Sequence, residues 1–177
     1  MIENKVAKSK LNTIDLEQFR ERREIVPFDL KDYLYMEFIL KEKDFRAALE
    51  EHDWQAYEGK IIAVHCSTDA IIAHWAYMLV CAHAREYAER VVFGSPEEVA
   101  LQRMQQHTRE FDWSAFDGKR VLLKGCSDEA MDPSIYAIAT QELLPYAERL
   151  MYGEACSFVP VYRKKKAPKA TPAQAES

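Results

Sequence analysis

The chain has 177 residues, of which 48% are hydrophobic and 30% are charged, and its formal net charge is −5. This composition suits one sizeable hydrophobic core and excludes a wholly disordered or collagen-like chain. The negative charge excludes a broad attraction to nucleic acid. The sequence has no apolar run of about 18 residues, which a membrane span needs, and Met1–Lys5 lacks the apolar start of a secretory signal. We therefore expect a cytoplasmic protein without nucleic-acid or membrane partners.

The N-terminal third contains short segments that favour different secondary structures. Residues 1–24 form a separate N-terminal segment in our interpretation. Residues 25–28 favour an edge strand because Pro27 cannot donate a backbone hydrogen bond. Residues 29–40 fit either a helix or a strand followed by a helix, and residues 44–51 fit a helix with Phe45, Ala48 and Leu49 on one face.

An internal repeat organises the rest of the chain. Residues 51–94 match residues 110–153 at an offset of 59 residues, through the shared strings Asp-Trp-x-Ala-aromatic-Glu/Asp-Gly-Lys and Tyr-Ala-Glu-Arg. Self-similarity at a fixed spacing is typical of a duplicated supersecondary unit. Each copy predicts a first strand (60–65, 119–124), a helix (71–85, 133–146) and a second strand (90–93, 149–152).

Two βαβ units predict an α/β fold with an open, mostly parallel sheet and an N-terminal α/β extension. Between the units, Ser95-Pro96-Glu97-Glu98 carries the start signals of a further helix to about residue 109. We expect one α/β domain over residues 25–162. Residues 163–177, rich in Lys, Ala and Pro, are expected to form a disordered basic tail.

Cysteines supply the main functional clue. Cys66 and Cys126 end the first strands of the two units, and Cys156 follows the last strand. If the two first strands lie side by side, Cys66 and Cys126 meet at the carboxyl edge of the sheet, where α/β folds bind ligands. Cys81 lies in an apolar helical stretch and is interpreted as a buried hydrophobic residue.

Three thiolates at one edge suit zinc or an iron–sulfur cluster. Further ligands are sought near the strand ends, in His74, Asp69 and Asp128. Gly125 fits a tight turn after the strand. The residues expected to flank the thiols are Ser67, Ser127 and Ser157.

Three other interpretations remain open. The cysteines can be inert core residues. Cys66 or Cys126, each before a helix N-terminus, can serve a thiol enzyme of sulfur or acyl transfer. The chain can also be an interaction scaffold that forms a homodimer. The recurring pairs Trp54/Trp113 and Tyr77/Tyr136 favour packing over ligand stacking.

The sequence resembles a bacterial family catalogued as domain of unknown function 2480. The resemblance covers residues 6–162 and is carried by the segments 28–32, 40–46, 66–71, 75–79, 124–127 and 153–157. It implies that the three Cys-Ser positions are family features, but it implies no activity. It also implies a link to iron–sulfur assembly, and hence an assembly protein as a partner.

Overall fold

The computed structural model describes residues 11–125 and 131–165, which fall into two compact units. The central unit comprises Phe19–His107, and the terminal unit comprises the described residues of Met1–Gln18 and Thr108–Ser177. Each unit has its own sheet. No helix formed by the described residues combines the length and apolar composition that crossing a bilayer requires.

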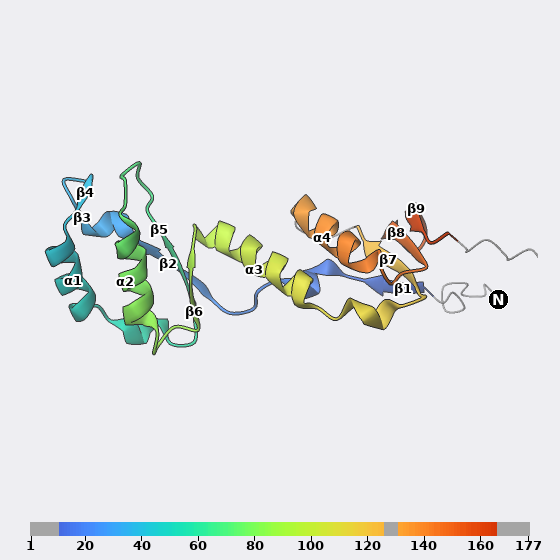
Figure 1. Ribbon diagram of the computed structural model, residues 1–177, viewed down its shortest axis with the longest axis horizontal. Helices are drawn as coiled ribbons and strands as arrows, with labels where there is room; N and C mark the ends of the chain where they lie inside the picture. Colours follow the sequence, from blue (N-terminus) through green and yellow to red (C-terminus); the bar gives the residue numbers. More distant parts are fainter. Residues whose placement is uncertain (1–10, 126–130, 166–177) are drawn as a thin grey trace, which may run out of the picture. The chain divides into compact units, whose positions relative to one another are not determined.

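The central unit has a three-stranded parallel sheet in the order β2 (Ile25–Asp29), β5 (Ile61–His65), β6 (Arg90–Phe93). The middle strand is buried on both faces, as expected for its apolar run. Helix α2 (His74–Ala84) packs its buried face on this sheet, and α1 (Glu42–Glu51) lies beside α2 (Figure 1). Buried Phe28, Phe45 and Leu49 join these elements into one core.

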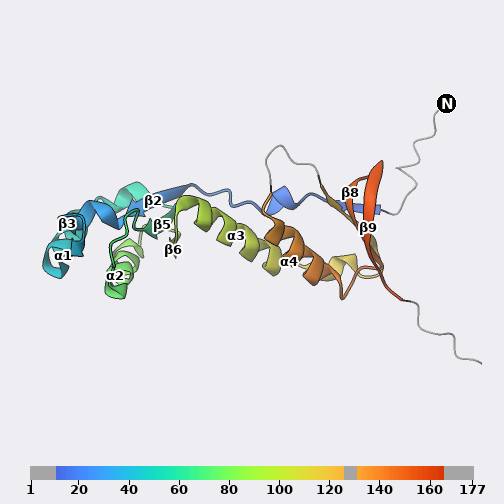
Figure 2. The same cartoon turned by 90° about the horizontal axis from the view of Figure 1, so that it is seen from above.

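The terminal unit has a four-stranded sheet in the order β1 (Leu11–Ile14), β7 (Arg120–Lys124), β8 (Arg149–Glu154), β9 (Ser157–Arg163). The first three strands are parallel, and β9 returns antiparallel beside β8 (Figure 2). Helix α4 (Pro133–Leu143) connects β7 to β8 and buries Ile135, Ala139 and Leu143. Asp132 caps this helix by accepting a hydrogen bond from the Ser134 backbone N–H at 2.8 Å.

One long helix and several short elements complete the part of the chain that the structure describes. Helix α3 (Pro96–Glu110) begins with a reciprocal capping box, because Ser95 and Glu98 each accept the other's backbone N–H. Within residues 11–125 and 131–165, the remaining elements are four short 3-10 helices and one two-stranded hairpin: η1 (Leu16–Phe19), η2 (Leu30–Tyr33), β3 (Leu34–Tyr35), β4 (Ile39–Leu40), η3 (Trp54–Tyr57) and η4 (Trp113–Phe116).

The two βαβ segments make matching contacts at the 59-residue offset. The indole N–H of Trp54 donates to the Leu49 carbonyl at 2.8 Å, and that of Trp113 donates to the Thr108 carbonyl at the same distance. Both indoles are buried, as a packing role predicts. The turns that follow also match: Gly59 (φ +69°) and Gly118 (φ +65°) precede the first strands of the two segments.

The α/β class with mostly parallel strands is confirmed. The expectation that the two first strands lie side by side is wrong, because β5 and β7 belong to different sheets. Both edges of each strand are already occupied: β5 lies between β2 and β6, and β7 lies between β1 and β8. The N-terminal strands β1 and β2 thus take the places that the prediction gave to the partner unit.

Several local predictions also change. Helix α2 begins at His74 rather than residue 71, because Ala73 has an extended backbone (φ −67°, ψ 138°) that interrupts a helix before this point. Cys81 is exposed rather than buried. Of residues 29–40, Asp29 ends β2 and the others form η2 and a hairpin. The predicted tail starts inside β9, because Arg163 is the last residue of that strand, and residues 166–177 lie outside the described residues. The predicted domain boundaries stay a prediction.

Candidate functional site

An aspartate stands at the carboxyl edge of the central sheet. Asp29 ends β2, and its Oδ1 accepts the backbone N–H groups of Lys31 and Ser67, both at 3.0 Å. Its Oδ2 lies 3.9 Å from Nε2 of His65 on the neighbouring strand. Burial raises the pKa of Asp29, but the hydrogen bonds from Ser67 and Lys31 outweigh burial and hold the pKa below its ordinary value. Asp29 therefore ties the loop after β5 to the end of β2.

The terminal sheet repeats this arrangement. Asp15 follows β1, its Oδ1 accepts the Glu17 backbone N–H at 3.0 Å, and its Oδ2 accepts Nζ of Lys124 at 2.8 Å. Lys124 is the counterpart of His65 at the 59-residue offset. The bond from Lys124 lowers the pKa of Asp15, and the Glu17 N–H lowers it further. Each sheet thus carries an aspartate opposite a basic residue at its carboxyl edge.

The cysteines occupy both units. Cys66 follows β5 in the central unit, is half-buried, and has its Sγ 3.3 Å from the Thr68 hydroxyl oxygen. Burial raises the pKa of Tyr77, and the nearby Cys66 thiol raises it further. Cys156 is exposed in the turn between β8 and β9 of the terminal unit, directly before Ser157, the first residue of β9. Cys126 lies outside the described residues, as do Ser127 and Asp128.

The other predicted ligands are solvent-facing. Asp69 is exposed in the loop after Ser67, and His74 is exposed as the first residue of α2. Within residues 11–125 and 131–165, no three His, Cys, Asp or Glu side chains come together as a metal-binding group. That geometry does not test a site that includes Cys126. The zinc, iron–sulfur and thiol-enzyme hypotheses stay predictions. They lose the argument that Cys66 and Cys126 end adjacent strands, because β5 and β7 belong to different sheets.

Gly125 packs tightly against β8. A Cβ on this residue would lie 2.9 Å from Cζ of Tyr152 and 3.1 Å from the Cα of Gly153. The backbone N–H of Gly125 donates to the Gly153 carbonyl at 3.2 Å. The close approach of Tyr152 and Gly153 thus explains why glycine is required at this position, where the sequence predicted only a tight turn.

Aromatic rings stand above the carboxyl edge in both units. In the central unit, Tyr77 and Phe93 meet edge to face, with ring centroids 5.2 Å apart. In the terminal unit, the corresponding residues Tyr136 and Tyr152 meet in the same way at 5.4 Å. The terminal pair places two phenol oxygens at this edge. The phenol of Tyr136 donates to the Lys124 carbonyl at 3.1 Å, and that of Tyr152 donates to the Gly125 carbonyl at 3.4 Å.

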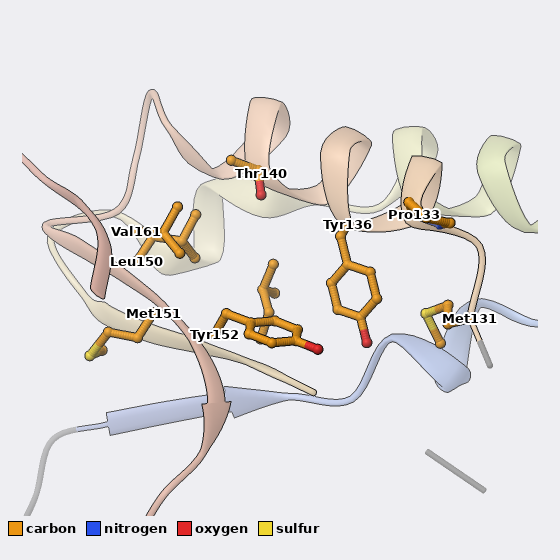
Figure 3. Close-up of a pocket in the computed structure, with 9 residues that line it drawn as sticks. Met131, Pro133, Tyr136, Thr140, Leu150, Met151, Tyr152 and Val161 are labelled. Atoms are coloured by element: carbon orange, nitrogen blue, oxygen red, sulfur yellow. The ribbon is translucent and has the colours of Figure 1, made fainter. Parts of the chain in front are cut away.

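A cavity of about 420 Å³ lies between α4 and the terminal sheet, beside these two phenols (Figure 3). Figure 3 shows Tyr136 reaching down from α4, Tyr152 lying across from it, and the Thr140 hydroxyl directed toward the space between helix and sheet. The rest of the lining is apolar and consists of Leu123, Met131, Pro133, Leu150, Met151 and Val161. The volume lies within the range of small-molecule sites.

The sequence prediction missed this cavity. It assigned Tyr136 to packing because the residue recurs as Tyr77, but Tyr136 also lines the cavity. One signal was present: Pro133 marks the start of a helix directly after a parallel strand, the place where α/β folds bind ligands. The contribution of Val161 could not be inferred, because β9 was not predicted.

A model of a known protein family matches most of the chain. Residues 1–164 match the model described as "Protein of unknown function (DUF2480)". The chain belongs to the DUF2480 family. The predicted resemblance is confirmed, and the family description assigns no activity to the edge or to the cavity. Comparisons with curated proteins and with solved structures found no match.

Proposed function

We propose that this DUF2480 protein binds a small aromatic molecule in the cavity between α4 and the terminal sheet. The observation that carries the proposal is a mainly apolar cavity of about 420 Å³ at the carboxyl edge of a parallel sheet. Sites of this size, position and lining are typical of ligand-binding α/β folds. Pro133, Met131 and Leu150 offer apolar contact area, and Tyr136 and Tyr152 offer ring edges and faces.

The polar groups of the cavity favour a ligand that donates a hydrogen bond. Tyr152 uses its hydroxyl hydrogen toward the Gly125 carbonyl, but a phenol oxygen also accepts hydrogen bonds. The Thr140 hydroxyl can accept as well. An aromatic ring with one N–H or O–H group would therefore satisfy both parts of the lining. We infer binding rather than catalysis, since the lining contains no carboxylate, imidazole, amine or thiol among the described residues, and both phenols already donate to backbone carbonyls.

Indole and N-methylindole test this proposal, because a methyl group replaces the N–H hydrogen and removes the donor; Tyr152→Phe separates loss of the hydrogen bond from the added size. We expect calorimetric titration of the full chain to show binding of indole, and binding of N-methylindole weaker by about fivefold through loss of one hydrogen bond. Tyr152→Phe should reduce this difference. Thr140→Leu should fill the cavity and weaken both ligands.

Cys81→Leu is the matched control, because Cys81 occupies the position of Thr140 in the other segment and is exposed on α2. This variant should bind indole as the unmodified chain does. The proposal fails if indole does not bind, or if Thr140→Leu binds it as tightly as Cys81→Leu.

A further inference from the structure

Three arginines form a row across the terminal sheet, at the end away from the cavity's phenols. Arg120 of β7 is the register partner of Arg149 of β8, and Arg149 is in turn the partner of Arg163 of β9. Register partners on neighbouring strands direct their side chains to the same face of a sheet. Three positive charges therefore stand side by side, an arrangement that is unfavourable when nothing compensates it.

No described carboxylate compensates the row. None of the three guanidinium groups forms an ion pair with a residue that the structure describes. The adjacent acid, Glu148, lines a neighbouring hollow with Arg120 and makes no ion pair with the row. In addition, Nε of Arg149 is buried and has no hydrogen-bond partner. A buried donor on a charged group is costly to leave unsatisfied, so this atom indicates that an acceptor is missing.

A second cavity of the terminal unit opens onto this row. Its volume is about 400 Å³, and all three arginines contribute to its lining. Phe158 and Pro160 of β9 contribute apolar surface to the same cavity, which shares Leu150, Met151 and Val161 with the cavity of the proposed function. The space thus has a strongly positive part and an apolar part.

The equivalent positions of the central sheet do not form a row of arginines. Arg90 is the counterpart of Arg149, but the counterpart of Arg120 is Ile61, so no row forms there. Basic residues near that end of the central sheet have acidic partners: Lys60 lies 3.2 Å from Glu24, and Arg23 lies 3.5 Å from Glu89. The unpaired row is therefore specific to the terminal unit and does not follow from the shared βαβ plan.

We propose that Arg120, Arg149 and Arg163 bind the phosphate group of a small phosphate ester whose apolar body lies on Phe158 and Pro160. The planar guanidinium presents several N–H donors in a fixed geometry that matches phosphate oxygens. Such an anion accepts guanidinium N–H groups and neutralises the row. Contact with the buried Nε–H of Arg149 requires this side chain to turn toward the cavity. The site is separate from the phenols of Tyr136 and Tyr152, so it does not depend on the proposed function.

Phenyl phosphate, inorganic phosphate and phenol serve as probes in calorimetric titrations of the full chain at low ionic strength. We expect phenyl phosphate to bind most tightly and inorganic phosphate more weakly. Any binding of phenol belongs to the first cavity, so it should be unchanged in Arg149→Gln. Arg149→Gln should weaken phenyl phosphate binding tenfold or more, as expected for loss of a charge-assisted hydrogen bond. Arg90→Gln, the matched control in the central unit, should leave this binding unchanged.

Thermal unfolding separates loss of the site from loss of the fold. Without ligand, Arg149→Gln should be at least as stable as the unmodified chain at low salt, because it relieves like-charge repulsion. Phenyl phosphate should raise the Tm of the unmodified chain and not that of the variant. The proposal is overturned if phenyl phosphate fails to bind or if Arg149→Gln binds it normally. It is also overturned if a single-stranded oligonucleotide binds to the chain and phenyl phosphate does not.

Discussion

Gly59 and Gly118 place the chain in the left-handed region directly before the first strand of each βαβ segment. A Cβ would meet no atom within 4 Å at either position, so any cost of substitution comes from the backbone conformation. We expect Gly118→Ala to lower the free energy of unfolding by about 1–2 kcal/mol. Asn tolerates this conformation better, so Gly118→Asn should cost less. Urea unfolding measures both, and equal stability of all three chains would contradict the explanation.

The carboxylate of Asp29 gives the central unit a pH-dependent anchor. Its pKa is lowered in the folded chain, so its ionised form contributes stability above the ordinary aspartate pKa of about 3.9. That contribution is lost as the pH falls through the lower, folded pKa. We expect Asp29→Asn, which keeps one acceptor oxygen, to destabilise the chain by about 1 kcal/mol at neutral pH. The difference should shrink in urea titrations at progressively lower pH; a constant difference would exclude an electrostatic origin.

Individual residues were predicted with uneven success. The glycine requirement at Gly125 was visible from the strand-to-helix spacing, but its physical cause is the Tyr152 ring on another strand. Cys81 was expected in the core because its neighbours are apolar, yet it occupies the exposed side of α2. A helix of mixed apolar composition does not reveal which face is covered, since the covering element lies elsewhere in the sequence.

The 3-10 helices η3 and η4 attach to the helices before them through a buried tryptophan. Trp113 and Trp54 each donate to a carbonyl five residues earlier, at 2.8 Å. Phenylalanine keeps most of the apolar contact but cannot donate, so the hydrogen bond from the indole N–H is lost. We expect Trp113→Phe and Trp54→Phe each to cost about 1–3 kcal/mol. Denaturant unfolding followed by circular dichroism checks this, and a neutral effect of both changes would show that the bond adds nothing.

Elements with local start signals were predictable. The Ser95, Pro96 and Glu98 pattern located the start of α3, because the capping bonds form within four residues. Strands β1 and β9 were not predicted. Residues 11–14 are too few and too mixed for a strand pattern, and β1 exists because β7 offers it a free edge. For β9, the return beside β8 is likewise set by tertiary pairing.

Each unit of the molecule has its own sheet and buried side chains, so we expect unfolding in two transitions rather than one. The tryptophans report them separately: Trp54 and Trp75 belong to the central unit, and Trp113 belongs to the terminal unit. Urea unfolding followed by fluorescence in Trp113→Phe should report the central unit alone. Its midpoint should differ from that of the terminal unit, measured with Trp54→Phe/Trp75→Phe, and coincident midpoints would indicate a single cooperative structure.

At the scale of the whole molecule, the repeat predicted two similar βαβ segments but not the pairing of their sheets. The prediction lacked β1, and it contained β2 only as an edge strand without a named neighbour. Neither strand carries a mark of the segment that it will join. Once Asp15 and Asp29 are compared, a shared Asp-Leu-x-x-aromatic string is visible after both strands. That string is short, and its offset differs from that of the main repeat. The candidate cavity was missed for a different reason, because Val161 lines it from β9, which was not predicted.

The order of the strands along the chain also bears on synthesis by the ribosome. Both β1 and β2 emerge first, and the central unit is complete once residue 107 has left the exit tunnel. At that moment β2 has found β5, whereas β7, the neighbour of β1, has not been translated. At this stage the central sheet can form, but β1 has no strand to pair with. A messenger RNA truncated at this point would therefore yield a folded central unit preceded by the unpaired segment of β1.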